Sequence, residues 1–125
     1  AEPLPRRAAL ERAYSAIVEY EQPLIWHLIE GLRPLESWRL WGIDDPSRKD
    51  ERLPTISITH AEKKPEELAA ELGRRGFYVW HGNYYALPLT ERLGLEPDGM
   101  IRIGLVHYNT RDEVDRLLAA LTELA

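Results

Sequence analysis

Hydrophobic positions recur with a helical period through the first part of the chain. Between residues 8 and 32 they fall three or four residues apart, or seven apart after two such steps: Leu10, Tyr14, Ile17, Leu24, Leu28 and Leu32. This spacing predicts one long amphipathic helix. Pro23 should kink that helix, because proline removes a backbone hydrogen bond and crowds the preceding turn. Pro34 should end it, since the residue before a proline disfavours helical angles.

Four short segments further along the chain have the patterns of strands. They are residues 38–41, 55–59, 77–80 and 100–106. The second alternates threonine or serine with isoleucine, which predicts a half-buried strand with one apolar face. The segment 42–53 between the first two strands is rich in aspartate, arginine and lysine, and predicts a surface loop.

Residues typical of helix ends mark two further helices. Pro65, followed by two glutamates, is expected in the first turn of a second helix, which Gly73 or Gly76 ends. Asn83 can cap a short third helix that runs to residue 93. Gly94 is then expected to close that helix in a left-handed conformation.

The last helix is predicted to begin with a capping box, in which Thr110 and Glu113 bind each other's backbone amide groups. The order of elements is then helix, two strands, helix, strand, short helix, strand, helix. This order favours an α+β fold. We expect a small three- to four-stranded, mostly antiparallel sheet with helices on one face, plus a long N-terminal helix. Within one domain of 1–125, residues 1–34 form a connecting helix and 35–125 an α/β sandwich.

Composition and charge narrow the possible functions. The chain has 125 residues, enough for one core, with 44% apolar and 30% charged residues. Its net charge of −5 argues against a nucleic-acid partner, and no apolar run approaches the roughly 20 residues of a membrane span. Cysteine is absent, so thiolate chemistry is excluded and the expected compartment is the cytoplasm. No histidines have the spacing of a helical metal site, and we expect no metal centre: His27, His60, His81 and His107.

The most unusual stretch runs from Trp80 to Leu89, where large polar aromatic residues follow a predicted strand. Asn83, Tyr84 and Tyr85 lie in the turn before a helix, a place where binding residues often gather. An alternative is purely structural. In that case Trp80 and Tyr85 pack in the core, and Asn83 and Tyr84 only form the turn.

Arg102 interrupts an otherwise apolar strand. Alternation along residues 100–106 places Arg102 on the same face as Gly104 and opposite Ile101 and Ile103. An arginine beside a glycine has open space in front of it, and its planar guanidinium binds a carboxylate through two hydrogen bonds. Arg102 is therefore a candidate carboxylate ligand. The alternative is an arginine that faces solvent on an exposed sheet face.

The segment RIGLVHYNTRDEVDRL, at residues 102–117, resembles the C-terminal signature of class V aminotransferase-fold proteins. The stretch Gly82–Leu89 resembles the loop that carries the nucleophilic cysteine of cysteine desulfurases, and the similarity spans about residues 53–123. This resemblance implies the C-terminal small domain of a fold type I enzyme that uses pyridoxal 5'-phosphate (PLP). It implies further that Arg102 binds the α-carboxylate of an amino-acid substrate.

Under the same resemblance, the loop formed by Asn83, Tyr84 and Tyr85 lines the substrate pocket. Tyr85 occupies the position of the desulfurase cysteine. A phenol cannot form a persulfide, so the chain departs from that chemistry. Cysteine-independent relatives such as selenocysteine lyases show that the fold supports other reactions.

The resemblance also implies parts that lie outside this chain. In such enzymes the large domain supplies the lysine that binds PLP, whereas the lysines here, Lys49, Lys63 and Lys64, lie in polar, loop-like contexts. We therefore expect PLP in the complete enzyme, none bound by this chain alone and no catalytic residue within it. The expected partners are a large PLP-binding domain, an amino-acid substrate and a second copy in a homodimer. Two alternatives are a stand-alone binding or regulatory domain without catalysis, and a structural role in which the long helix packs on a partner.

Overall fold

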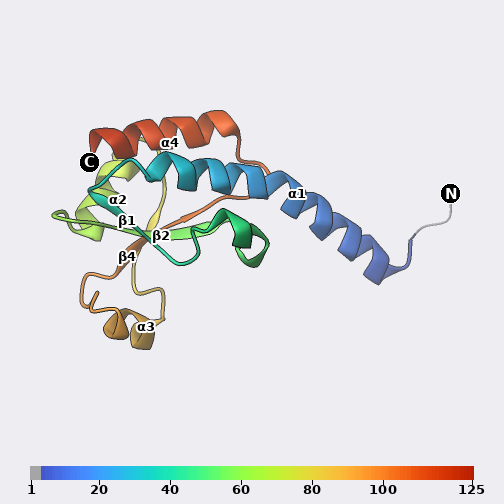
Figure 1. Cartoon of the computed structure of the whole chain (residues 1–125), viewed down its shortest axis with the longest axis horizontal. Coiled ribbons are helices and arrows are strands. Elements are labelled where there is room, and N and C mark those ends of the chain that lie inside the picture. The colour runs from blue at the N-terminus through green and yellow to red at the C-terminus, as the bar shows by residue number, and fades with distance from the viewer. Residues whose placement is uncertain (1–3) are drawn as a thin grey trace.

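The computed structural model of the chain describes residues 4–125 and shows a four-stranded sheet with helices (Figure 1). Helices and strands follow the order expected from the sequence, with one added 3-10 helix, η1. Their bounds are α1 Arg6–Leu32, β1 Trp38–Trp41, η1 Pro46–Glu51, β2 Thr55–His60, α2 Pro65–Arg74, β3 Trp80–Gly82, α3 Leu87–Arg92, β4 Met100–Gly104 and α4 Arg111–Glu123.

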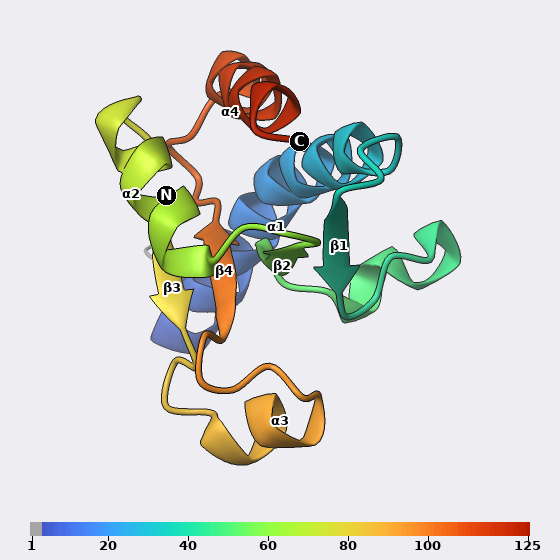
Figure 2. The same cartoon turned by 90° about the vertical axis from the view of Figure 1, so that its left-hand side faces the viewer.

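The sheet has the strand order β1-β2-β4-β3, and each neighbouring pair is antiparallel. Figure 2 shows the strands with α1, α2 and α4 together on one side and α3 beyond one end of the sheet. The predicted α+β architecture, with a small antiparallel sheet and a long N-terminal helix, is confirmed. The pairing register joins four residues in one row across the sheet: Trp41, Ser57, Arg102 and Trp80.

The hydrophobic core lies between the sheet and its covering helices. Isoleucines of the two central strands meet buried residues of α1, α2 and α4 there, among them Ile56, Ile58, Ile101, Ile103, Ile25, Leu28, Leu72 and Leu121. Trp38 adds a buried indole whose Nε1 donates a hydrogen bond to the carbonyl of Leu121 at 3.0 Å, which ties β1 to α4. The face that carries these isoleucines is called the covered face below.

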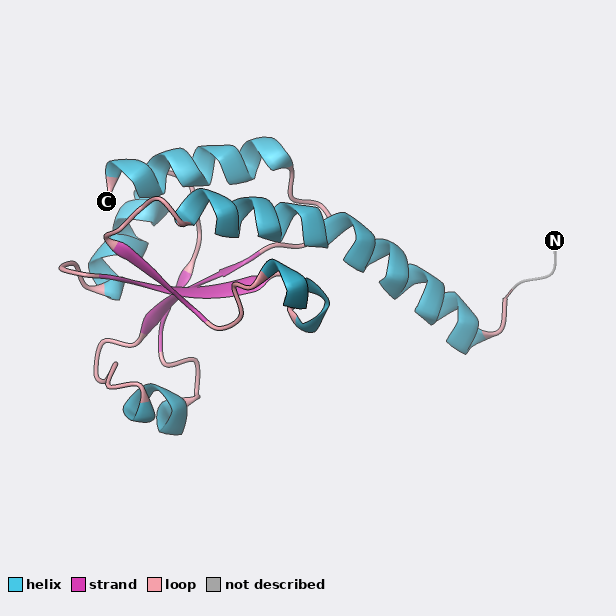
Figure 3. Cartoon of the chain, viewed as in Figure 1, coloured by secondary structure: helices cyan, strands magenta, loops and turns pink. Residues whose placement is uncertain are grey.

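Helix α1 has two unlike halves. Its C-terminal half, from Glu21 to Leu32, contains all the buried residues of the helix. The N-terminal half extends beyond the rest of the molecule (Figure 3) and exposes Leu10, Tyr14 and Val18. The helix runs on through Pro23 as a single element. No helix within residues 4–125 is long and apolar enough to cross a membrane.

Several predicted helix ends are confirmed. Thr110 and Glu113 form the capping box at the start of α4, and Pro65 lies in the first turn of α2. Gly94 closes α3 with a φ of 70°, in the left-handed region that favours glycine. These caps satisfy backbone groups that a helix end would otherwise leave without partners.

Two local predictions are wrong. The third strand is Trp80–Gly82 rather than residues 77–80, because the amide of Phe77 binds the carbonyl of Leu72 and so completes the end of α2. Asn83 does not cap α3, which begins at Leu87 after an N-cap at Ala86. The Asn83 side chain instead accepts a hydrogen bond from the backbone amide of Tyr85 at 3.2 Å.

Candidate functional site

Strand β4 presents alternate residues to the two faces of the sheet. Ile101 and Ile103 are buried on the covered face, whereas Arg102 is half-buried and Gly104 exposed on the opposite face. This opposite face, which carries Ser57 of β2, Arg102 and Gly104 of β4 and Trp80 of β3, is called the open face below. The predicted placement of Arg102 beside Gly104 is confirmed.

Two aromatic rings flank the guanidinium of Arg102. Its Cζ lies 5.4 Å from the centre of the Trp80 ring and 5.0 Å from the centre of the Tyr84 ring. Both distances lie within the range of a cation–π interaction. Within residues 4–125 no carboxylate forms an ion pair with Arg102. The arginine is therefore supported by aromatic rings, and its charge has no carboxylate partner in this part of the protein.

The loop from Asn83 to Ala86 brings Tyr84 to this position. Tyr84 and Tyr85 have φ angles of 55° and 62°, in a left-handed region that non-glycine residues seldom adopt. Such a conformation costs about 1–2 kcal/mol per residue. The loop is held by the hydrogen bond to the Asn83 side chain and by one from the amide of Ala86 to the carbonyl of Asn83 at 2.8 Å.

The hydroxyl of Tyr84 donates a hydrogen bond to the backbone carbonyl of Met100, at the start of β4. This bond ties the loop to the strand that carries Arg102. Burial raises the pKa of Tyr84 above its ordinary value of 10, although the nearby charge of Arg102 acts in the opposite direction. Tyr84 is therefore a neutral hydrogen-bond donor near neutral pH and is unsuited to act as a base.

Tyr85 has a different environment from Tyr84. Its side chain is 96% exposed, and that of Trp80 is 56% exposed. The alternative in which Trp80 and Tyr85 pack in the core is therefore wrong. All four sequence candidates, Arg102, Asn83, Tyr84 and Tyr85, belong to β4 or to the loop that follows its neighbour β3. The structure brings Arg102 and Tyr84 into contact, while Tyr85 extends from the same loop into solvent.

Residues of β1 and β2 also belong to the open face, and the sequence did not single them out. Trp41 pairs with Ser57, which in turn pairs with Arg102. The Trp41 indole donates a hydrogen bond to the hydroxyl of Thr59 at 3.0 Å, and the guanidinium of Arg39 lies 3.9 Å above its ring. The alternation of Trp38–Trp41 could have indicated which residues share a face, but not which strand they join.

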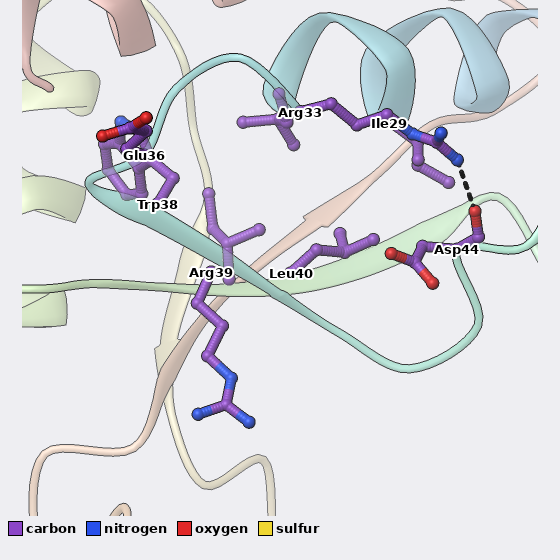
Figure 4. Close-up of a pocket in the computed structure, with 9 residues that line it drawn as sticks. Ile29, Arg33, Glu36, Trp38, Arg39, Leu40 and Asp44 are labelled. Carbon is purple, nitrogen blue, oxygen red and sulfur yellow. Dashed lines mark hydrogen bonds between the residues drawn. The ribbon is translucent and has the colours of Figure 1, made fainter.

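A pocket between the C-terminal end of α1 and β1 lies apart from these candidates. Its lining includes Ile29, Arg33, Trp38 and Asp44. Figure 4 shows the guanidinium of Arg33 donating to the backbone carbonyl of Asp44, at 2.6 Å, while the guanidinium of Arg39 points away from both. None of the four sequence candidates lines this pocket. We therefore assign the candidate site to the open face.

Lysines and histidines lie elsewhere in the described part of the chain. Lys49 is exposed in η1, Lys63 donates to the carbonyl of Leu124 at 2.5 Å, and Lys64 pairs with Asp98 at 3.2 Å. Histidine, aspartate and glutamate side chains within residues 4–125 form no group of three that could hold a metal ion. The candidate site thus consists of one arginine, aromatic rings and small polar groups, which suits a carboxylate ligand rather than a cation.

Comparisons with known proteins identify the family to which the chain belongs. The chain is 34% identical over 114 residues to the Aminotransferase-like protein FGM3 of Gibberella zeae. This match covers 89% of this chain and 28% of that protein. It is also 32% identical over 109 residues to a cysteine desulfurase of Serratia proteamaculans. That match covers 87% of this chain and 25% of the desulfurase. The chain thus spans about a quarter of the length of these relatives.

A solved structure shows the same fold. The apo structure of a cysteine desulfurase from Thermococcus onnurineus NA1 superposes with a TM-score of 0.81 at 27% identity, and the match covers 94% of this chain and 28% of that one. The sequence profile described as Aminotransferase class-V matches residues 9–117. Since this match takes in most of the chain, the chain belongs to the class-V aminotransferase family.

Proposed function

We propose that the chain is the small-domain portion of a PLP-dependent enzyme that acts on an amino acid, and that Arg102 binds the α-carboxylate of the substrate. The single observation that carries the proposal is the half-buried guanidinium of Arg102, held between Trp80 and Tyr84 with no carboxylate partner in residues 4–125. A charge in this setting gains most from an anionic ligand that forms two hydrogen bonds with it. Gly104 leaves space for the ligand beside the guanidinium.

The cofactor itself does not fit the residues of this chain. A PLP enzyme needs a lysine that bonds to the cofactor, and none of the three lysines lies on the open face. Two of them are engaged in surface contacts with Leu124 and Asp98. We therefore place the cofactor lysine in a large domain encoded outside this chain, and derive no reaction step from the residues present here.

The reaction is proposed to be independent of a cysteine nucleophile. Tyr85 occupies the place of the desulfurase cysteine by resemblance, and its exposed side chain leaves the loop toward solvent. A phenol cannot carry a persulfide. We place the parent protein with the cysteine-independent lyases and transferases of this fold, of which the selenocysteine lyases are an example, and place it in the cytoplasm. Asn83, Tyr84 and Tyr85 would line the substrate pocket.

The experiment that tests the proposal uses the protein that carries this chain together with its large domain. Arg102→Ala should weaken the binding of an amino-acid substrate by about 1.5–3 kcal/mol, the value of a hydrogen-bonded charge. The affinity is measured by titrating the substrate against the absorbance of the bound cofactor. Arg116→Gln, which changes an exposed arginine of α4 paired with Asp112, is the matched control. If Arg102→Ala left the affinity unchanged, Arg102 would not be the residue that binds the substrate carboxylate.

The exposed half of α1 is proposed to pack on other parts of the assembled protein. Leu10, Tyr14 and Val18 form an apolar stripe that residues 4–125 leave exposed, and such stripes mark interaction surfaces. We propose that the stripe contacts the large domain within a homodimer. Light scattering of the complete protein should give the mass of a dimer, and a monomer at all concentrations would refute the dimer.

The second candidate is a stand-alone binding or regulatory domain that keeps the fold without catalysis. The placement of the lysines favours the binding domain as much as it favours the enzyme, because a domain without a cofactor lysine cannot catalyse PLP chemistry alone. The open reading frame separates the two candidates. An upstream region that contains a PLP-binding lysine supports the enzyme, and its absence supports the binding domain.

A further inference from the structure

Trp80 is the part of the open face that the carboxylate site does not account for. It pairs directly with Arg102 across β3 and β4, and 56% of its surface is exposed. One of its roles is to support the guanidinium, whose Cζ lies 5.4 Å from its ring. The exposed remainder of the indole is an apolar surface beside the place where a carboxylate would bind.

The two sides of Arg102 differ in character. Toward β1 lie the small hydroxyl of Ser57 and then Trp41, whose ring is already covered by the guanidinium of Arg39 at 3.9 Å. Toward the edge strand β3 lie Trp80 and Tyr84, and among residues 4–125 Arg102 is the one cation stacked on either ring. A ligand held by its carboxylate therefore finds the exposed aromatic surface of Trp80 on the side of β3.

We propose that Trp80 is a specificity-determining residue, which selects carboxylates with a flat apolar group, such as amino acids with aromatic side chains. This inference rests on the proposed function of Arg102 and adds the substrate class. An aromatic group stacks on an exposed indole in an offset or edge-to-face arrangement. A cationic side chain is disfavoured, because the guanidinium of Arg102 lies beside the exposed indole, with its Cζ 5.4 Å from the ring centre.

Tyr84 is assigned a positioning role in the same site. Its hydroxyl binds the Met100 carbonyl, its backbone adopts a left-handed conformation, and its ring lies 5.0 Å from Arg102. The ring limits the directions that the guanidinium can take. Within the pocket that it lines, Tyr84 thus acts by holding Arg102 in place.

The test uses the protein that carries this chain together with its large domain, and two ligands that share a carboxylate, acetate and phenylacetate. Binding is followed by NMR on the indole NH signal of Trp80 and the side-chain NH signal of Arg102. Phenylacetate should bind roughly 3- to 10-fold more tightly than acetate, as expected for one aromatic contact. Trp80→Leu should abolish this preference, and it should also weaken acetate because Arg102 loses one of its two flanking rings. Trp80→Phe should retain part of the preference.

Matched variants separate the inference from the proposed function. Tyr108→Leu, which removes an exposed aromatic residue from the loop between β4 and α4, should leave the preference unchanged. Equal affinity of both ligands in the unaltered chain, or a preference that persists in Trp80→Leu, overturns the inference alone. Binding of neither ligand, or binding that is unaffected by Arg102→Gln, overturns the proposed function as well. Signal dispersion in each spectrum shows that the variant is folded.

The positioning role of Tyr84 has its own readout. Tyr84→Leu should broaden the Arg102 side-chain signal and weaken both ligands by the same factor, because the guanidinium loses one flanking ring. Tyr84→Phe keeps the ring and should restore a sharp signal and most of the affinity. A sharp signal and full affinity in Tyr84→Leu would refute the positioning role.

Discussion

The two faces of β4 carry opposite properties, although they are built from alternate residues of one short strand. Ile101 and Ile103 on the covered face are almost completely buried among helices. Arg102 and Gly104, one residue away, lie on a face with a half-buried cation, exposed aromatic rings and a strained loop. The covered face stabilises the domain through apolar burial. The open face instead exposes polar and aromatic side chains, which contribute little to stability.

This contrast teaches how the fold can change chemistry while keeping its structure. Because strand side chains alternate, substitutions on the open face need not disturb the core beneath them. The same holds for the loop of Tyr84 and Tyr85, which lies at the edge of the sheet. The proposed function therefore depends on one face of the sheet and on the loop beside it.

Ile101→Ala gives the largest expected effect and tests the contrast directly. Ile101 is 0% exposed, so its truncation leaves a cavity and should lower the free energy of unfolding by about 2–5 kcal/mol. Arg102→Gln, at the next residue on the open face, should change it by less than about 1 kcal/mol. Urea unfolding followed by circular dichroism measures both. Similar losses in the two variants would show that the open face also stabilises the fold.

Gly99→Ala should have the next largest effect, because Gly99 packs against Gly82, where the loop that carries Tyr84 and Tyr85 begins. Gly99 has a φ of 72°, and a Cβ there would lie 2.3 Å from backbone atoms of Gly82. Strain and overlap together should cost about 2–4 kcal/mol, and should displace the loop from Arg102.

Gly94→Ala is the matched control for that substitution. Gly94 also has a positive φ, of 70°, but no atom of residues 4–125 that could clash lies within 4 Å of an added Cβ. It should therefore cost only the conformational strain of about 1–2 kcal/mol. Urea unfolding compares the pair, and equal losses would mean that the approach of Gly99 to Gly82 has no importance.

The sequence predicted the covered face better than the open one, for a physical reason. Apolar periodicity and helix caps are local signals, and the capping box of Thr110 and the alternation around Arg102 could be predicted from them. The row from Trp41 to Trp80 depends on the register of strands far apart in the chain. No local pattern contains that register.

The wrong third strand has a related cause. Phe77 and Val79 are apolar because they pack against the core below α2, and not because they pair with β4. The apolar pattern reports burial, and both strands and helix ends can bury a side chain. The pairing itself begins at Trp80, where the chain reaches Arg102.

Tyr84→Phe tests a hydrogen bond of the open face, with a smaller expected effect. Loss of the bond to the Met100 carbonyl should lower the free energy of unfolding by about 1 kcal/mol at neutral pH. The raised pKa of Tyr84 means that the unfolded chain loses this proton first as the pH rises through 10, so stability should fall there. Absorbance of the six tyrosines should show one late ionisation that Tyr84→Phe removes. A titration without such a phenol would contradict its burial.

His60 on the covered face provides the smallest expected effect and the opposite dependence on pH. Its Nδ1 accepts hydrogen bonds from the amides of Glu62 and Lys63, each at 3.1 Å, and Nε2 is buried without a hydrogen-bond partner among the described residues. Burial, and then the charge of Lys63, lowers the pKa of His60 below its ordinary value of 6.5.

The unfolded chain therefore binds a proton at His60 more readily than the folded one. Stability due to His60 is complete above pH 6.5 and is lost as the pH falls toward the lower pKa of the folded state. His60→Asn keeps an acceptor for the two amides but cannot be protonated, so its urea midpoint should fall less between pH 7.5 and pH 5.5 than that of the unaltered chain. An equal fall in both proteins would assign the acid sensitivity to groups other than His60.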